Sequence, residues 1–213
     1  IAVADDPGMH SSQNEQDSRH YAIAAKVPML EPSDSQECLD FVKKAYEISE
    51  KYDTPVLLRL STRISHSRSI VQFSQREQPT LKEYKKDIKK YVMMPQFARG
   101  RHVVVEERMK ALGEYSESCE LNKIEMGGRI GVIASGIAYD YAREALGDKA
   151  SYLKLGLVNP LPVKLIKEFA KSVDELYVIE ELDDIIETHC KKNGIDVKGK
   201  ELFSYLGEYT ASD

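Results

Sequence analysis

Short apolar runs alternate with helical patterns in both halves of this chain, and this alternation constrains the fold more than any other feature. In the second half, strands are expected at residues 130–134, 152–155 and 176–180, and helices at residues 136–146, 162–171 and 183–192. Crossovers between parallel strands are right-handed and place helices on both faces of a sheet. The second half therefore predicts a mainly parallel sheet covered by helices.

The first half predicts a similar arrangement. Compact apolar runs indicate buried strands at residues 1–4, 27–30 and 56–60. Ser33 with Gln36 has the spacing of a capping box, and apolar residues recur at intervals of three and four over residues 34–52, where a helix is expected. A strand, this helix and the next strand complete a βαβ unit, which is the building block of parallel sheets.

Residues 73–128 have a different pattern, in which charged residues dominate and no strand is expected. Thr80 with Glu83 opens one predicted helix, and Pro95 suits the first turn of a longer helix that ends near Glu117. Basic and acidic residues alternate on these helices, which favours a solvated face over a phosphate site. The predicted fold class is therefore α/β, with two mainly parallel open sheets and their flanking helices. One sheet is expected in residues 1–72 and the other in residues 129–213, and residues 73–128 form the helical connector between them.

Composition excludes several classes of function. A net charge of -5 and a pI near 5.7 argue against nucleic-acid binding, which needs a concentrated basic surface. The sequence has neither an apolar stretch of the roughly 20 residues needed to cross a bilayer nor the basic start of a signal peptide, so a cytoplasmic protein without a membrane partner is expected. The chain starts with Ile1 inside an apparent strand, which favours an internal piece of a longer protein.

The cysteines are too few and too widely spaced for a disulfide framework, a zinc motif or an iron–sulfur motif, and metal ligands are not expected in this chain. They are Cys38, Cys119 and Cys190.

The segment DDPGMHSSQNEQDSR, residues 5–19, follows the first apolar run and combines carboxylates, amides, hydroxyls, a histidine and an arginine. Parallel sheets bind their ligands beyond the carboxyl ends of the strands, where this segment is expected to lie. Ser12 with Glu15 has capping-box spacing, so a helix is expected to start near Gln13 and to favour an anionic ligand at its free N–H groups. The alternative is that the segment forms only a polar surface turn.

Several segments resemble the alpha subunits of indolepyruvate:ferredoxin oxidoreductases, which belong to the thiamine diphosphate-dependent 2-oxoacid:ferredoxin oxidoreductase superfamily. Besides residues 5–19, the resemblance rests on LLRLSTRISHS at 57–67, VMMPQFARGRHVVVEERMKAL at 92–112 and GRIGVIASGIAYDYARE at 128–144. It implies that residues 1–72 form the C-terminal half of a pyrimidine-binding-like domain. Residues 129–213 would form a domain like the C-terminal domain of transketolase, after the connector of residues 73–128.

The resemblance also implies a function for the complete enzyme in aromatic amino acid catabolism. That enzyme would oxidatively decarboxylate aryl pyruvates to aryl acetyl-CoA and pass the electrons to ferredoxin. Thiamine diphosphate, Mg²⁺ and [4Fe-4S] clusters would be its cofactors, and a beta subunit, ferredoxin, the 2-oxoacid and coenzyme A would be its partners, in an oligomer. The alternatives are a related enzyme for pyruvate, 2-oxoglutarate or branched-chain 2-oxoacids, and a non-catalytic α/β interaction module.

By the same resemblance, ten residues are expected to line a crevice for cofactor or substrate: His10, Ser11, Ser12, Gln13, Asn14, Arg19, Thr62, Arg63, Ser65 and His66. No catalytic residue is expected here, because the glutamate that the family uses lies upstream of residue 1 and Gly147-Asp148-Lys149 does not match the family's Gly-Asp-Gly segment. This piece alone is therefore expected to be inactive and to bind no cofactor.

Two of these interpretations have alternatives. Arg19 would bind a carboxylate in a bidentate manner, or it would be an exposed helix residue paired with Glu15. His66 would contact substrate or carry a proton, or it would be a hydrogen-bonded loop residue. The adjacent Glu180 and Glu181 are expected to have a surface or domain-contact role, because consecutive strand residues point to opposite faces.

Overall fold

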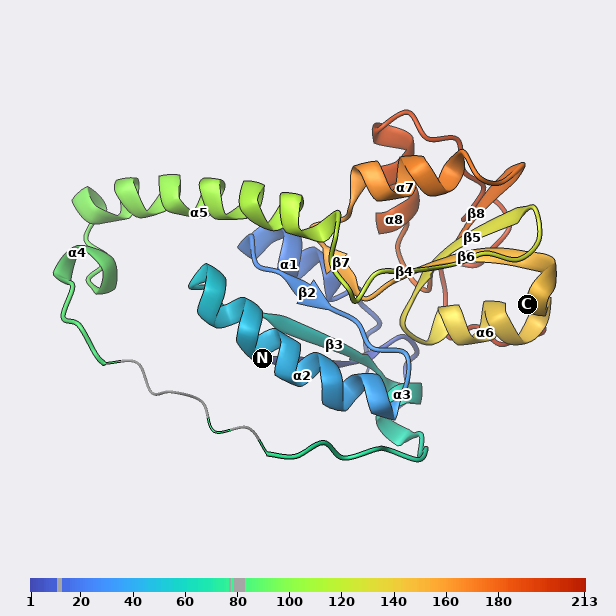
Figure 1. Cartoon of the computed structure of the whole chain (residues 1–213), viewed down its shortest axis with the longest axis horizontal. Coiled ribbons are helices and arrows are strands. Elements are labelled where there is room, and N and C mark those ends of the chain that lie inside the picture. The colour runs from blue at the N-terminus through green and yellow to red at the C-terminus, as the bar shows by residue number, and fades with distance from the viewer. Residues whose placement is uncertain (11–12, 77, 79–82) are drawn as a thin grey trace.

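The computed structural model describes residues 1–10, 13–76, 78 and 83–213, and it contains two sheets (Figure 1). The first sheet has the strand order β1-β3-β2-β7. Its strands are β1 (Ala2–Asp6), β2 (Met29–Leu30), β3 (Leu57–Ser61) and β7 (Leu157–Asn159). β1 and β2 run parallel to β3, whereas β7 is antiparallel to β2.

The second sheet has the order β4-β6-β5-β8. Its strands are β4 (Lys123–Glu125), β5 (Ile130–Ser135), β6 (Ala150–Leu155) and β8 (Glu175–Ile179). β5, β6 and β8 are parallel, and only the edge strand β4 is antiparallel. The predicted α/β class with two mainly parallel open sheets is confirmed.

The alternation of side chains along β5 explains how helices cover both faces of the second sheet. Val132 and Ala134 pack in one cluster with Tyr139 of α6 (Gly136–Leu146). Ile133 points to the other face, where it packs with Ile166 of α7 (Val163–Ala170) and with residues of α8 (Ile185–Lys192). Successive strand residues face opposite sides, so a fully apolar strand requires cover on both.

Helix α2 (Ser35–Tyr52) packs Phe41 and Ile48 against Leu30 and Leu58 of the first sheet. Its N-cap is Asp34, whose side chain accepts the N–H of Glu37 at 2.7 Å, while the Glu37 carboxylate accepts the N–H of Ser33 at 3.0 Å. The predicted capping box of Ser33 and Gln36 is therefore wrong: the N-cap is Asp34, and Glu37 accepts the N–H of the residue before it. The predicted helix over residues 34–52 is confirmed.

The two sheets share one hydrophobic core, in which Met29 and Leu57 of the first sheet pack in the same cluster as Ile133 and Leu153 of the second. The chain also passes directly from β6 to β7 through Gly156, whose carbonyl accepts the N–H of Glu31 at 2.9 Å. The relative position of the two sheets is thus set by apolar packing and by a shared backbone connection.

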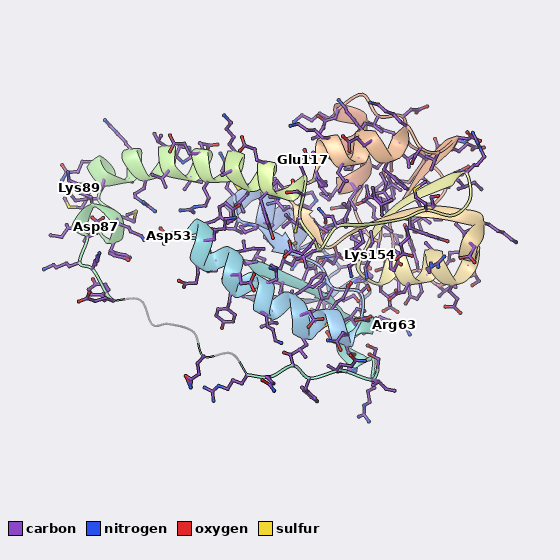
Figure 2. All side chains as sticks on the ribbon, viewed as in Figure 1. Asp53, Arg63, Asp87, Lys89, Glu117 and Lys154 are labelled. Carbon is purple, nitrogen blue, oxygen red and sulfur yellow. The ribbon has the colours of Figure 1, made fainter. Side chains whose placement is uncertain are left out.

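The long helix α5 (Pro95–Ser116) is confirmed as predicted, and its buried Leu112 packs against the first sheet's core. Figures 1 and 2 show that its N-terminal half and α4 (Ile88–Tyr91) project away from the sheets. Just beyond its C-terminal end, Glu117 accepts the backbone N–H groups of Lys164 and Leu165 at 3.1 and 2.9 Å and so caps α7. In the described parts of the chain no helix is long and apolar enough to cross a bilayer.

Three predictions about secondary structure are wrong or fall outside the described residues. No helix starts near Gln13: α1 (Arg19–Ala25) starts six residues later, because the Glu15 carboxylate accepts the N–H of Gly8 at 2.6 Å instead of capping a helix. The expected absence of strands from residues 73–128 is wrong, since β4 pairs there with β6. Thr80 lies outside the described residues, and the described helix of that region covers only α4.

Candidate functional site

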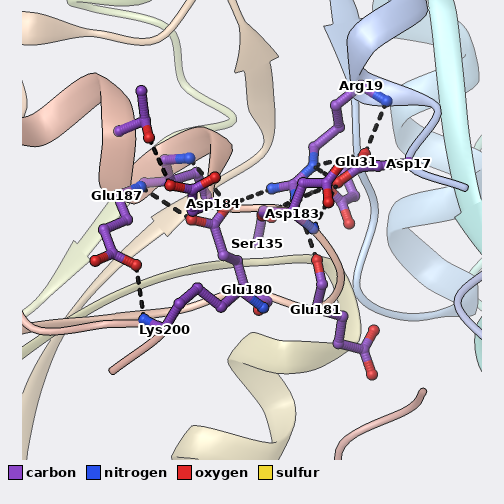
Figure 3. A network of polar contacts seen from close by, with 12 residues as sticks. Asp17, Arg19, Glu31, Ser135, Glu180, Glu181, Asp183, Asp184, Glu187 and Lys200 are labelled. Atoms are coloured by element: carbon purple, nitrogen blue, oxygen red, sulfur yellow. Dashed lines mark hydrogen bonds and ion pairs between the residues drawn. The ribbon is translucent and has the colours of Figure 1, made fainter. Parts of the chain in front are cut away.

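The carboxyl ends of the parallel strands of both sheets meet in a polar junction (Figure 3). Glu31 follows β2 and accepts the hydroxyl hydrogen of Ser135, the last residue of β5, at 3.0 Å. Arg19 starts α1 and donates to Glu180, which follows β8, at 2.5 Å. Loops at the carboxyl ends of such strands are the usual ligand-binding places of parallel sheets. This polar junction is therefore the candidate functional site.

Arg19 lies at the centre of the junction and is only 1% exposed. Its Nε and Nη2 atoms bind the Asp17 carboxylate at 3.0 and 2.6 Å, and Nη2 also donates to the carbonyls of Glu181 and Asp183 at 3.1 and 2.8 Å. The guanidinium thus uses donors on every nitrogen for protein acceptors (Figure 3). The interpretation of Arg19 as an exposed helix residue paired with Glu15 is wrong, since Arg19 is buried and pairs with Asp17. It does bind a carboxylate through two nitrogens, but that carboxylate belongs to Asp17, and a contact between Arg19 and a ligand stays a prediction.

Charge pairing decides the ionisation of this network. Burial by itself would raise the pKa of Asp17, but the hydrogen bonds and the charge of Arg19 outweigh it and hold the pKa at about 2. Burial would lower the pKa of Arg19, yet the charges of Glu180 and Asp17 raise it above its usual range. Asp17 and Arg19 therefore remain a charged pair at neutral pH.

A second buried ion pair joins Glu31 and Arg59 of β3, which are 7% and 4% exposed. Gly136, the first residue of α6, lies against the Glu31 carboxylate with φ at +52°. A Cβ atom there would lie 2.6 Å from Glu31 Oε1, closer than atoms can approach. This close approach and the left-handed backbone together require glycine.

Glu180 and Glu181 are 3% and 7% exposed, so the expected surface role is wrong, whereas both residues do make contacts between distant segments. Glu180 accepts the N–H groups of Ile186 and Glu187, both at 2.9 Å, and so caps the start of α8. Glu181 accepts the N–H of Tyr209 at 2.9 Å. Burial raises the pKa of Glu181 to about 7, although that N–H group lowers it.

His10 and Arg63 both lie against one carboxylate, that of Glu208 near residue 213. Glu208 Oε1 lies 3.2 Å from His10 Nε2, and Glu208 Oε2 lies 2.5 Å from Arg63 Nη2. The side chains of His10 and Arg63 are 47% and 53% exposed, so both stay accessible from solvent. The structure thus brings one residue from each of the two predicted site segments together.

The other predicted site residues that the structure describes are mostly exposed. Ser65 and His66 belong to the short helix α3 (Thr62–His66) that follows β3, and both are exposed, while Thr62 is half-buried. The hydroxyl of Ser65 donates to the carbonyl of Ser61 at 2.9 Å. Gln13 and Asn14 are exposed, and Asn14 Nδ2 donates to Gln16 at 3.3 Å. Ser11 and Ser12 lie outside the described residues.

The residues present do not fit a magnesium diphosphate site. Within residues 1–10, 13–76, 78 and 83–213, no three His, Cys, Asp or Glu side chains converge as metal ligands. Asp148, in the segment nearest to a Gly-Asp-Gly motif, is 95% exposed and pairs with Arg143 at 3.1 Å. The carboxylates of the junction already accept hydrogen bonds from protein groups.

Sequence reasoning missed the residues that organise the junction: Asp17, Glu31, Arg59, Ser135 and Glu208. One signal was available, because Arg59 is a charged residue inside the apolar run LLRLS and a buried charge requires a partner. Nothing in the sequence relates Glu208 to Arg63, since 145 residues separate them.

Comparisons with known proteins agree with this architecture. The pattern of the family "Pyruvate flavodoxin/ferredoxin oxidoreductase, thiamine diP-bdg" matches residues 4–121. The chain is 44% identical over 96% of its length to "Indolepyruvate oxidoreductase subunit IorA" of Methanothermobacter thermautotrophicus, and 38% identical over 99% to the protein of that name from Pyrococcus horikoshii. It spans 36% and 35% of those two relatives.

A solved structure also has this fold. The 2-oxoglutarate:ferredoxin oxidoreductase from Magnetococcus marinus, determined with 2-oxoglutarate, coenzyme A and succinyl-CoA bound, matches 99% of this chain and 46% of its own chain. The TM-score is 0.64 at 14% sequence identity, so this likeness concerns the fold.

Proposed function

The chain belongs to the pyruvate flavodoxin/ferredoxin oxidoreductase family, in its thiamine diphosphate-binding domain, and on that premise we propose that it is part of the alpha subunit of an indolepyruvate:ferredoxin oxidoreductase. The relatives named indolepyruvate oxidoreductase, at 37–44% identity, support this assignment. The complete enzyme would oxidatively decarboxylate aryl pyruvates to aryl acetyl-CoA and reduce ferredoxin. Because the chain spans only about a third of those relatives, most of that enzyme lies outside it.

We further propose that residues 1–72 and 129–213 are the pyrimidine-binding-like and transketolase C-terminal-like domains, joined by the connector of residues 73–128. The beta subunit, ferredoxin and coenzyme A would be partners in a cytoplasmic oligomer, and the magnesium ion and [4Fe-4S] clusters would bind to other parts of the enzyme. We expect this chain alone to be inactive, because the reacting groups of the enzyme would come from its other parts.

The observation that carries the proposed role of this chain is the Glu208 carboxylate, which binds Arg63 and lies 3.2 Å from His10 Nε2. A guanidinium is the preferred partner of a carboxylate because its planar fork of donors matches the two oxygens. Arg63 follows β3 and His10 follows β1, which are neighbouring parallel strands, so both side chains reach the same edge of the sheet. The Glu208 carboxylate marks the position at which a ligand of the same chemistry would bind.

We infer that Arg63 and His10 bind the carboxylate of the 2-oxoacid. The other predicted residues of the two segments, Gln13, Asn14, Thr62, Ser65 and His66, would line the same crevice, and Ser11 and Ser12 lie outside the described residues. Arg19 would act from inside the protein, where it fixes the loop after β1 on the second sheet. The role of this chain is thus to bind and orient the substrate, and the reacting groups are contributed by the rest of the enzyme.

The test uses the complete subunit with its beta partner and follows reduction of a dye acceptor with indolepyruvate. Arg63→Met removes a half-exposed ion pair, and the expected effect is about a two- to fivefold increase in the KM for indolepyruvate. Arg68→Met is the matched control, because Arg68 is an exposed arginine five residues further along the chain. An Arg63→Met enzyme with the KM of the wild type would refute the binding role.

The same assay separates the alternative functions. Turnover with pyruvate, 2-oxoglutarate or a branched-chain 2-oxoacid in preference to indolepyruvate would assign the protein to another branch of the superfamily. No turnover with any 2-oxoacid would support a non-catalytic interaction module. Calorimetry with thiamine diphosphate is expected to detect binding to the assembled enzyme and none to this chain alone.

A further inference from the structure

We propose that Glu208 is an internal competitor of the substrate: its carboxylate occupies the place of the 2-oxoacid carboxylate on Arg63 and His10, and substrate must displace it. This inference rests on the proposed function, since it takes Arg63 as the substrate-binding group. Glu208 would thus determine the apparent affinity of the enzyme for the 2-oxoacid, and residues 199–213, here called the strap, would act as a gate.

The strap comes after α8 in the chain and returns to the polar junction. The structure describes all of residues 199–213, which form turns and bends without a helix or strand. At its tip, the N–H of Gly207 donates to Glu15 at 3.1 Å, and Glu15 also accepts the N–H of Gly8 at 2.6 Å. The tip therefore touches the loop that carries His10 as well as Arg63 after β3.

The strap is firmly attached on both sides of its tip. Lys200 Nζ donates to the carbonyl of Glu180 at 2.6 Å and to the Tyr209 hydroxyl at 2.8 Å. Tyr209 is 4% exposed, packs against Phe203 with ring centroids 5.8 Å apart, and donates its N–H to Glu181. Release of the Glu208 side chain therefore leaves these attachments in place, and the tip alone needs to move.

The tip itself is weakly held. Tyr205 and Leu206 are 50% and 76% exposed, so little apolar surface fixes them. Arg63 is more than half exposed, and ion pairs at such positions strengthen an association only about two- to fivefold. Gly207 has φ at +77°, which glycine adopts without strain. An incoming carboxylate therefore faces a competitor that it can displace at moderate concentration.

The arrangement also keeps the basic pair ordered before substrate arrives. Without a partner, the long side chain of Arg63 would sample many rotamers, and binding would then include the entropy of ordering it. Glu208 holds it in a carboxylate-binding geometry, and the exchange of one carboxylate for another preserves that geometry. The carboxylate of Glu208 moves into solvent, and no covalent bond changes.

The test compares Glu208→Gln with Glu201→Gln in the complete subunit with its beta partner. Glutamine keeps the shape of the side chain but lacks the charge, so the KM for indolepyruvate is expected to fall about two- to fivefold. Glu201 is an exposed glutamate of the same strap without a role in the proposed site, and its variant is expected to keep the wild-type KM.

Hydrogen exchange provides a readout that does not depend on turnover. In the wild type, addition of indolepyruvate is expected to accelerate exchange at the Gly207 amide, which bonds to Glu15, relative to the Tyr209 amide. In Glu208→Gln, the Gly207 amide is expected to exchange faster even without substrate.

The outcomes separate the two proposals. If Arg63→Met raises the KM but Glu208→Gln changes neither the KM nor the exchange at Gly207, the gating role is overturned and the proposed function stands. If Arg63→Met leaves the KM unchanged, the substrate-binding assignment fails, and the gating role fails with it.

Discussion

Replacement of Arg19 by methionine is expected to destabilise the protein more than any surface substitution. The side chains of Arg19, Asp17 and Glu180 are 2%, 0% and 2% exposed, so the variant leaves two carboxylates buried without their guanidinium. Loss of one member of a buried ion pair costs about 3–5 kcal/mol. The pKa of Asp17, about 2 against an ordinary 3.8, accounts for roughly 2.5 kcal/mol of that range.

The pH dependence of this loss follows from the same groups. In the wild type, the lowered pKa of Asp17 contributes stability that is present above pH 3.8 and is lost as the pH falls towards 2. In the variant, burial without Arg19 raises the pKa of both carboxyls, so each takes up a proton as the pH falls. The destabilisation by Arg19→Met is therefore expected to be larger at pH 8 than at pH 5.

Urea unfolding followed by circular dichroism at pH 5 and pH 8 measures both effects. Arg99→Met is the matched control, because Arg99 is an exposed arginine on α5 and its loss is expected to change the free energy of unfolding by at most about 0.5 kcal/mol. The reasoning is refuted if Arg19→Met costs less than about 1 kcal/mol at pH 8, or if the cost is the same at both pH values.

Two further predictions concern the junction. Burial raises the pKa of Glu181 from 4.5 to about 7, so the free energy of unfolding is expected to fall by about 3 kcal/mol as the pH rises through that interval and Glu181 loses its proton. Glu181→Gln is expected to remove this decline when urea unfolding is measured at several pH values. An unchanged pH profile would contradict the prediction. Gly136→Ala is expected to cost about 2–4 kcal/mol in thermal or urea unfolding, because of the positive φ and the adjacent carboxylate. Gly113 lies in α5, and a Cβ atom there would meet no other atom within 4 Å, so Gly113→Ala is expected to stabilise the protein by about 0.5–1 kcal/mol. Equal effects of the two substitutions would contradict the role of Gly136.

Local patterns were sufficient for most of the helices and strands. The helix predicted at residues 136–146 is found within the same limits, and that predicted at 34–52 differs from α2 by one residue. These elements have apolar periodicities that only one local structure satisfies. The predicted helix near Gln13 failed because Glu15 binds Gly8 and Gly207, the latter 192 residues away, instead of capping a helix.

The site was only partly predictable for the same reason. The segments that carry His10 and Arg63 could be placed at the ligand-binding edge because they follow apolar strands, and the family resemblance then selected the residues within them. Their common partner, Glu208, comes from a segment without helix or strand, and no local rule relates it to them. The burial of Arg19 was not predictable because it depends on acceptors at residues 180–183.

For this protein, the order of apolar and polar residues alone determined the α/β class, most of the helices and strands, and the segments that carry the candidate site, because these depend on the periodicity of side chains within a few turns or strands. Tertiary structure decided which charges are buried, which carboxylate each arginine binds, and that β7 joins the first sheet after β6. Those features depend on the meeting of two sheets from distant parts of the chain. Because these charges are buried, loss of one partner of a pair costs several kcal/mol of stability.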